Sequence, residues 1–104
     1  MNPTLEMSRP KVPVLAVYDG HDCAIGRAND NDIVLPGRDV SRYHAAIECD
    51  GLQMWVRDMG SRNGTSLNGE RLVGYGELHC GDELRLGSGV VFRIQLMGMA
   101  PVDI

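Results

Sequence analysis

The sequence predicts an all-β domain, an antiparallel β-sandwich of short strands. Glycine and proline are frequent, with 13 and 5 residues in a chain of 104, so no stretch of a dozen residues keeps the 3.6-residue apolar period of a helix. Short runs of alternating apolar and polar residues occur instead, as in strands that bury one face. Turn residues separate these runs at intervals of about 8 to 12 residues, a spacing typical of sandwiches and barrels.

The expected strands share this alternation. In chain order they are 14–18, 23–27, 33–35, 45–50, 53–58, 66–67, 70–72, 83–87 and 90–97. Alternate apolar residues form the clearest stripe in the last of them, and Trp55 and Val56 are expected to anchor 53–58 in the core. The dipeptides Asp50-Gly51 and Asn68-Gly69 are typical of two-residue hairpin turns, so the strands on either side of each should pair antiparallel.

Length and charge limit the classes of protein to consider. A chain of 104 residues is one domain with a modest core, expected over 12–97, and 1–11 and 98–104 read as tails or linker stubs. The net charge is −4, so we expect no direct binding to nucleic acid.

No apolar run approaches the roughly 18 residues of a membrane span, and no signal sequence is recognisable. We therefore expect no membrane insertion and a cytoplasmic location.

The three cysteines, Cys23, Cys49 and Cys80, are expected to be buried, reduced thiols. Their number is odd, and none of them forms a CxxC pair that would suggest a disulfide framework or a zinc ribbon. The histidines lack the spacing of metal ligands as well. We expect neither a metal nor a cofactor.

The candidate catalytic groups do not form a recognisable motif. Ser41, His44 and Asp58 supply the residue types of a hydrolase triad, but no Gly-x-Ser-x-Gly elbow surrounds the serine. Cys80 directly follows His79, and adjacent side chains on a strand point to opposite faces, which prevents the histidine from activating the thiol. The sequence therefore favours a binding module over an enzyme.

Two segments, 26–45 and 58–69, are dense in Gly, Asn, Arg and Ser. The loops of a sandwich gather at its two ends, so Arg27, Arg42 and Arg62 are expected at one apical rim. Three guanidiniums suit a phosphate, which accepts charge-assisted hydrogen bonds from arginine, hydroxyl and amide donors. The alternative is that these arginines pair with nearby aspartates, as exposed charges usually do.

The order and spacing of these residues resemble the forkhead-associated (FHA) domain family, from about 14 to 96. The shared motifs are Gly26-Arg27, Asn31-Asp32-Ile33-Val34-Leu35, Ser41-Arg42-Tyr43-His44-Ala45, Asp58 to Thr65, Asn68-Gly69 and Gly81-Asp82. The resemblance implies an eleven-stranded β-sandwich whose apical loops bind a phosphothreonine peptide of a partner protein, phosphorylated by an upstream Ser/Thr kinase. A phosphate-independent scaffold of the same fold stays open as the alternative, and so do further domains of a longer parent chain.

The resemblance also implies a role for individual residues of the loops. Arg27 and Ser41 correspond to the main phosphate ligands of the family. Arg42 and Arg62 stand where relatives add contacts to the phosphate. Asn63 resembles the residue that hydrogen-bonds the peptide main chain beside the phosphothreonine.

Other motif residues are implied to be structural. They are Gly26, His44, Gly64, Thr65, Asn68 and Gly69. His44 resembles a buried histidine that ties the apical loops together, while Thr65 and Asn68 are expected to hold the loop by side-chain hydrogen bonds. Asp39 stands where some relatives carry a basic residue that reads an acidic side chain three residues after the phosphothreonine. The resemblance therefore disfavours a preference for an acidic side chain at that peptide position.

Overall fold

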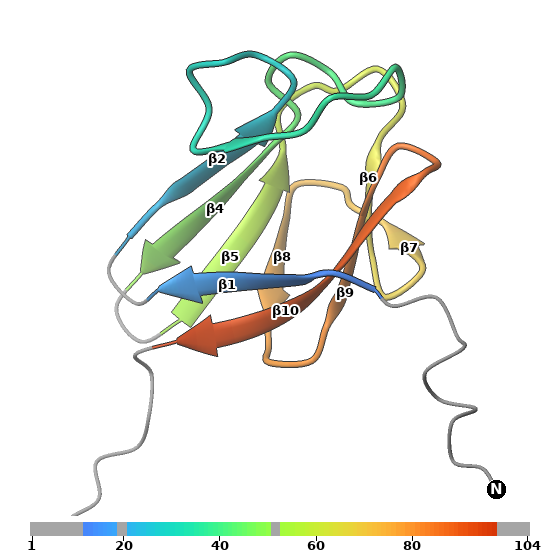
Figure 1. Cartoon of the computed structure of the whole chain (residues 1–104). Coiled ribbons are helices and arrows are strands. Elements are labelled where there is room, and N and C mark those ends of the chain that lie inside the picture. Colours follow the sequence, from blue (N-terminus) through green and yellow to red (C-terminus); the bar gives the residue numbers. More distant parts are fainter. Residues whose placement is uncertain (1–11, 19–20, 51–52, 98–104) are drawn as a thin grey trace, which may run out of the picture.

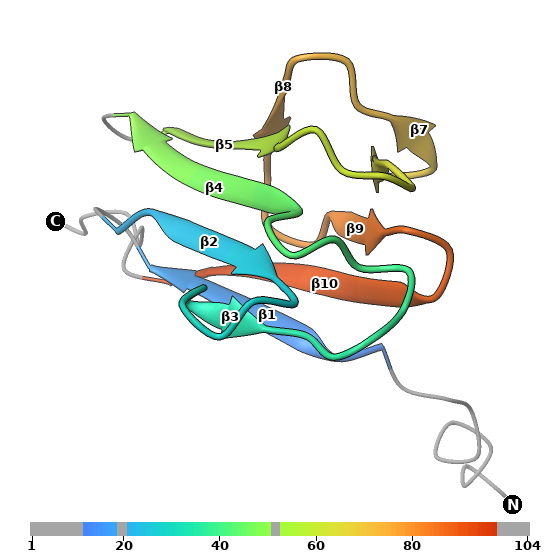
Figure 2. The same ribbon diagram turned by 90° about the horizontal axis from the view of Figure 1, so that it is seen from above.

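The structure is a computed structural model of the chain, and it describes residues 12–18, 21–50 and 53–97. These residues form two five-stranded sheets packed as a β-sandwich (Figures 1 and 2). They contain no helix, so the prediction of an all-β sandwich is confirmed. Within the same ranges, no helix is long and apolar enough to span a membrane. The expected tails, 1–11 and 98–104, lie outside the described residues.

Each sheet combines strands from distant parts of the sequence. The order of the first sheet is β1 (Val14–Tyr18), β10 (Val90–Met97), β9 (Glu83–Leu86), β6 (Thr65–Leu67) and β7 (Glu70–Arg71). The order of the second sheet is β3 (Ile33–Val34), β2 (Cys23–Gly26), β4 (Ala45–Asp50), β5 (Gln53–Asp58) and β8 (Tyr75–Leu78). The strands that flank Asp50-Gly51 pair antiparallel as expected, although Gly51 itself lies outside the described residues.

The sequence did not indicate β8. This strand contains Gly76 and lacks a clear alternation, yet it pairs antiparallel with β5. A Cβ at Gly76 would lie 2.7 Å from the Leu72 side chain and 3.0 Å from that of Leu67. The strand therefore uses its glycine to let two leucines pack against its backbone.

Two details of the predicted sandwich are wrong. The described residues form ten strands instead of eleven. The sheets are also mixed instead of antiparallel, since β1–β10 and β2–β3 are parallel pairs. The partners β1 and β10 come from opposite ends of the domain, so no tight turn dictates an antiparallel pairing.

The core lies between the two sheets and follows the predicted alternation. Its fully buried members are Ile25, Ala45, Ile47, Met54, Val56, Leu84, Leu86 and Ile94. The alternate residues of β10 contribute as expected, with Ile94 buried and Val90, Phe92 and Leu96 packed against the core. Trp55 differs from the expectation. Its neighbours Met54 and Val56 face the core, so Trp55 lies half-buried on the outer face of β5.

The three cysteines form no disulfide, but the expectation that all three are buried is wrong. Cys23 and Cys49 are partly buried, whereas Cys80 is exposed, because it follows β8 in a surface turn. Burial raises the pKa of the Cys23 thiol to about 11, and the carboxylate of Asp32 adds to the shift. Cys23 is therefore a protonated, weakly nucleophilic thiol at neutral pH.

Candidate functional site

Three loops gather at one end of the sandwich, at the top of Figure 1. They connect β2 to β3, β3 to β4, and β5 to β6. Backbone hydrogen bonds join the first two loops, from Arg27 N–H to the Ser41 carbonyl (2.9 Å) and from Ala28 N–H to the Arg42 carbonyl (3.0 Å). The third loop is attached where Arg62 N–H donates to Ser41 Oγ at 2.9 Å. These hydrogen bonds hold the three loops in place relative to one another.

His44 connects these loops from below and is fully buried. Ser41 N–H donates to His44 Nδ1 at 3.0 Å, so the opposite ring nitrogen, Nε2, carries the proton and donates to the Gly64 carbonyl at 2.9 Å. One imidazole therefore spans the β3–β4 and β5–β6 loops with both ring nitrogens satisfied. This geometry gives His44 a structural position with no open nitrogen for catalysis.

Asp58 organises the β5–β6 loop at the end of β5. Its carboxylate accepts hydrogen bonds from Gly60 N–H (3.0 Å), Ser61 N–H (2.9 Å), the Ser61 hydroxyl and Thr65 Oγ1 (2.6 Å). Burial by itself would raise the pKa of this carboxyl group, but the hydrogen bonds from Ser61, Thr65 and the loop backbone outweigh burial and hold the pKa below its usual value. Ser61 Oγ in turn accepts from Gly64 N–H at 2.9 Å.

Gly26 and Asn31 bring the β2 end against the β3–β4 loop. A Cβ at Gly26 would lie 2.2 Å from the Arg42 carbonyl oxygen, so only glycine allows this approach. The buried Asn31 donates from Nδ2 to the same oxygen at 2.7 Å and to the Ala28 carbonyl at 2.9 Å. The backbone on which Arg27 and Arg42 stand is therefore tightly packed.

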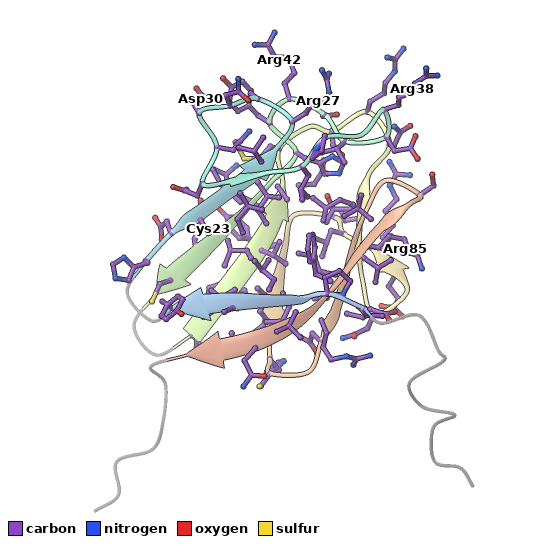
Figure 3. The ribbon with its side chains drawn as sticks, in the orientation of Figure 1. Cys23, Arg27, Asp30, Arg38, Arg42 and Arg85 are labelled. Carbon is purple, nitrogen blue, oxygen red and sulfur yellow. The ribbon has the colours of Figure 1, made fainter. Side chains whose placement is uncertain are left out.

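The arginines at this end are exposed, and Figure 3 shows Arg27, Arg38 and Arg42 projecting from it. Arg27 Nε donates to the Val40 carbonyl at 3.1 Å, which orients the guanidinium and leaves its two terminal nitrogens without a hydrogen bond to any described residue. A hollow of about 440 Å³ is lined by Arg27, Gly37 and Arg38. Arg62 is exposed as well. Two of the exposed arginines, Arg27 and Arg38, thus line an open hollow.

The aspartates that could have neutralised these arginines have other partners. Asp30 accepts from the Tyr43 hydroxyl at 2.9 Å, an interaction that raises the pKa of Tyr43, and Asp32 accepts from Ala24 N–H at 2.7 Å. Asp39 accepts from the Ser88 hydroxyl. Among the described residues, no ion pair involves an apical arginine. The alternative that these arginines serve as partners of the aspartates is therefore not what the structure shows.

Ser41 and Asn63 add polar groups of defined orientation. Ser41 Oγ accepts the Arg62 N–H, so its own hydroxyl proton is available to a ligand. Asn63 donates from Nδ2 to the Asp39 carbonyl at 3.1 Å, which leaves the carboxamide oxygen available to accept a hydrogen bond. The structure thus brings Arg27, Ser41, Arg42, Arg62 and Asn63 to one end of the molecule, as the sequence predicted. Their roles in binding remain predictions.

Two predicted structural residues lie elsewhere. Asn68 and Gly69 form the β6–β7 turn, with φ angles of 52° and 88°. Asn68 bonds Glu83 N–H through Oδ1 (2.9 Å) and Asp82 through Nδ2 (3.0 Å), so it fastens β6 to the start of β9 instead of holding the apical loop. Thr65 does hold the loop, but through the Asp58 carboxylate.

The hydrolase triad is not formed. Ser41 Oγ contacts the Arg62 backbone, His44 bonds backbone groups, and Asp58 bonds the β5–β6 loop. Within the described residues, no three side chains of His, Cys, Asp or Glu are grouped as metal ligands.

Sequence reasoning missed three contributors to this end of the molecule. Arg38 lies beside Arg27 without any motif to mark it. The hydrogen bonds of Asn31 depend on loops that are distant in sequence. The role of Ser61 could have been found, because a serine three residues after Asp58 is typical of a turn in which the carboxylate caps the backbone.

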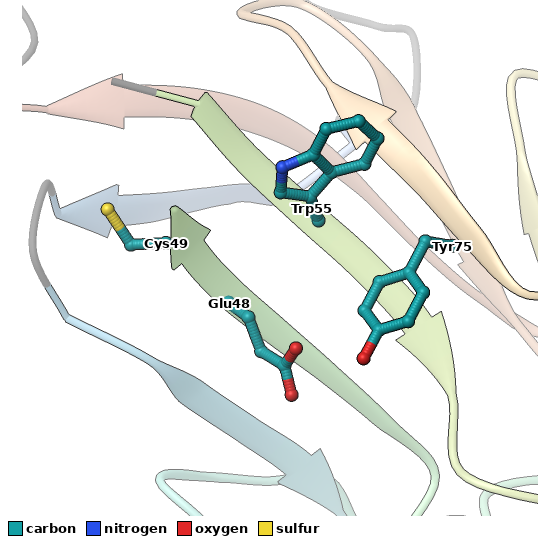
Figure 4. A pocket seen from close by; sticks show the side chains of 4 residues that line it. All are labelled: Glu48, Cys49, Trp55 and Tyr75. Atoms are coloured by element: carbon teal, nitrogen blue, oxygen red, sulfur yellow. The ribbon is translucent and has the colours of Figure 1, made fainter. Parts of the chain in front are cut away.

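A second hollow, of about 470 Å³, lies on the outer face of β4, β5 and β8 (Figure 4). It is lined by Glu48, Cys49, Trp55 and Tyr75. Arg57 contacts this face, with Nε 3.0 Å from Glu48 Oε2 and its guanidinium 5.9 Å from the Tyr75 ring centre. Because Glu48 is paired with Arg57, this hollow does not present a group of unpaired charges to a ligand.

Comparisons with known proteins agree with the motifs. Residues 23–87 match the model of the FHA domain. The glycogen accumulation regulator GarA of Mycolicibacterium smegmatis is 44% identical over 71 residues, which are 68% of this chain and 44% of GarA. The transcriptional regulatory protein EmbR of Mycobacterium tuberculosis is 42% identical over 62 residues, 60% of this chain and 16% of EmbR. The chain thus spans less than half the length of these relatives.

Solved structures show the same fold. M. tuberculosis EmbR, in complex with a low-affinity phosphopeptide, matches with a TM-score of 0.69 and 34% identity, over 78% of this chain and 21% of that one. The FHA domain of FhaA, complexed with the intracellular domain of Rv3910, matches with a TM-score of 0.59 and 33% identity, over 76% and 77% of the two chains. The matched motifs, the sandwich and the family model agree: this chain belongs to the FHA domain family.

Proposed function

We propose that this domain binds phosphothreonine peptides of partner proteins in Ser/Thr kinase signalling, with Arg27 and Ser41 as the main phosphate ligands. The observation that carries the proposal is the pairing of an oriented, unneutralised guanidinium with a hydroxyl whose proton is free to donate. Both residues stand on loops joined by the 2.9 Å hydrogen bond from Arg27 N–H to the Ser41 carbonyl. A phosphate dianion matches such a site in charge and in hydrogen-bonding capacity.

The other apical residues complete the proposed recognition. Arg42 and Arg62 add positive charge around the phosphate, which strengthens attraction and speeds encounter. The free carboxamide oxygen of Asn63 accepts a backbone N–H of the peptide and sets the register of the bound peptide. No step of this recognition breaks a bond, so we propose a binding module without catalytic activity.

The relatives support the ligand class. A phosphopeptide is the ligand of EmbR in the matching structure, and another FHA domain with a TM-score of 0.64 was described in a study of phosphothreonine-dependent FHA interactions. We propose for this chain a phosphorylated protein partner, a Ser/Thr kinase upstream of it, and a cytoplasmic location. The activity of any longer parent protein is a separate matter, since the relatives share only part of their length with this chain.

Three matched peptides test the proposal by calorimetry. They carry phosphothreonine, phosphoserine or unmodified threonine at the central position of an otherwise degenerate sequence. We expect micromolar binding of the phosphothreonine peptide, no binding of the threonine peptide, and weaker binding below pH about 6, where the phosphate loses its second charge. Equal binding of the phosphorylated and unmodified peptides would contradict the proposal.

A phosphate-independent scaffold is the alternative, and the hollow around Trp55 gives it a location (Figure 4). Trp55 and Tyr75 present aromatic surface on an outer sheet face, a composition enriched at protein interfaces. The two functions use different residues, those of the apical loops and those on the outer face of β4, β5 and β8. Trp55→Ala should leave binding of the phosphothreonine peptide unchanged. Peptide binding that is lost in Trp55→Ala and kept in Arg27→Ala would favour the scaffold.

A further inference from the structure

Strand β1 ends the first sheet, and one of its two edges has no neighbouring strand among the residues that the structure describes. Its other edge pairs in parallel with β10, where Arg93 N–H donates to the Pro13 carbonyl at 2.9 Å. In a parallel pair, alternate residues of a strand direct their backbone groups to the same neighbour. Leu15 and Val17 therefore also face β10, while Val14, Ala16 and Tyr18 direct their backbone N–H and C=O groups to the open edge.

Among the residues that the structure describes, these outward groups are almost all unpaired. The Tyr18 carbonyl accepts from His21 N–H at 3.2 Å, but no residue that the structure describes hydrogen-bonds the backbone of Val14 or Ala16 at this edge. An open hollow of about 340 Å³ runs beside the strand. It is lined by Ala16, Tyr18, His21, Asp22, Cys23 and Asp32. Within the described residues, no strand pairs with this edge of β1, and Ala16 is exposed beside the hollow.

The sequence of β1, Val-Leu-Ala-Val-Tyr, lacks the usual protection of an exposed edge. Native sheets discourage edge pairing with charged side chains, prolines or bulges, and this strand contains none of them. Its solvent side is also apolar, since Val14 is 59% and Tyr18 is 55% exposed. A free edge with apolar side chains is the surface to which another strand adds.

We propose that β1 pairs antiparallel with β1 of a second copy of this chain, about a two-fold axis that passes beside Ala16. This register sets Ala16 opposite Ala16 and Val14 opposite Tyr18 of the second copy. A β-branched residue opposite an aromatic one is a favourable cross-strand pair. The outward N–H and C=O groups of Ala16 then bond each other across the axis, and the interface is self-complementary, as a two-fold contact requires.

The pairing leaves the apical loops free. Strand β1 lies away from the end that carries Arg27 and Arg42 (Figures 1 and 3), so each copy keeps its candidate phosphopeptide site. Two open sites in one assembly would bind a doubly phosphorylated partner, or two copies of it, with raised effective concentration. The self-association itself does not depend on the proposed function and can be tested without any peptide.

Sedimentation velocity of the purified chain, from micromolar to millimolar concentration, tests the proposal. The decisive variant is Ala16→Pro, because residue 16 directs its N–H to the open edge and proline removes that donor without breaking the β1–β10 ladder. Ala16→Lys places a charge on the same edge. Gln95→Lys is the control, since Gln95 is the register neighbour of Ala16 on β10 and adds the same charge one strand from the edge.

We expect concentration-dependent dimers of the wild type and of Gln95→Lys, with association weakened by about tenfold or more in Ala16→Pro and Ala16→Lys. Thermal unfolding of each variant confirms that it is folded. A wild type that stays monomeric up to millimolar concentration would overturn the proposal. Dimers that persist unchanged in both Ala16 variants would overturn it too, and would point to another interface.

Discussion

The hydroxyl of Ser41 accepts a hydrogen bond of 2.9 Å from the backbone N–H of Arg62. This contact joins the β3–β4 and β5–β6 loops, which are separated by two strands in the sequence, and the hydrogen bonds of His44 and Asn63 join the same loops. It also orients the hydroxyl, because an oxygen that accepts from Arg62 turns its own proton elsewhere. The proton is then available as a donor on a residue whose carbonyl accepts from Arg27 N–H, and a hydroxyl and a guanidinium are both groups that bind anions.

Replacing Ser41 by alanine should weaken phosphothreonine-peptide binding by about ten- to a hundredfold. The change removes the hydroxyl donor and also the acceptor that holds Arg62 N–H. Calorimetry on Ser41→Ala measures the effect, with Ser66→Ala as the control because Ser66 lies on β6, outside the apical loops. Unchanged affinity in Ser41→Ala would show that Ser41 is not a ligand.

Replacing Gly26 by alanine should destabilise the domain by about 1 to 3 kcal/mol and reduce peptide binding. The new Cβ would lie 2.2 Å from the Arg42 carbonyl oxygen, so the loops that carry Arg27 and Arg42 must move apart. Denaturant unfolding measures the stability. Gly89→Ala is the matched control, since its Cβ would meet only Asp39 Oδ2, at 3.8 Å. Equal stability of the two variants would disprove the steric argument.

Acidification should loosen the β5–β6 loop through Asp58. The pKa of this carboxyl group lies below its usual value of 3.8 in the folded state, so its stabilising effect is complete above that pH and is lost as the pH falls through the lower, folded-state value. Thermal unfolding between pH 6 and pH 2 should show a steeper loss of stability below pH 3.8 in the wild type than in Asp58→Asn. Parallel curves for the two proteins would contradict this role.

Arg38 should favour an acidic side chain near the phosphothreonine. The sequence-based expectation, drawn from Asp39, disfavoured an acidic side chain in the peptide. The Asp39 carboxylate is held by the Ser88 hydroxyl, whereas Arg38 lines the hollow beside Arg27. Arg38→Ala should lower the affinity for a phosphothreonine peptide with flanking Asp or Glu by about fivefold and leave a neutral peptide unaffected. A library in which the wild type avoids acidic residues would support the sequence-based expectation instead.

The sandwich could be predicted because its strands follow simple alternation. Leu84 and Leu86 alternate with polar residues, and both are fully buried. Strand β8 could not be predicted, because Gly76 carries no side chain to alternate, and its place depends on Leu67 and Leu72 from the other sheet and its connection. The parallel pairing of β1 with β10 also depends on how the whole domain packs, so no local sequence pattern could predict it.

The candidate site was predicted where the relevant residues stand in the family motifs. Arg27, Ser41 and Asn63 were located in this way, and the structure places them at one end. Arg38 was missed because its position beside Arg27 arises only from the approach of the β3–β4 loop to Arg27. Asn68 was assigned to the wrong place because a motif does not show that β6 carries the chain away from the apical loops.

Arg27 provides the most direct test of the central claim that the apical loops bind a phosphorylated peptide. The measurement is calorimetric titration of wild type, Arg27→Ala and Arg93→Ala with one phosphothreonine peptide. Arg93 is an exposed arginine on β10, outside the apical loops, and matches the change in charge. We predict that Arg27→Ala loses about 1.5 to 3 kcal/mol of binding free energy while Arg93→Ala binds like the wild type. Equal affinities of all three proteins would contradict the account.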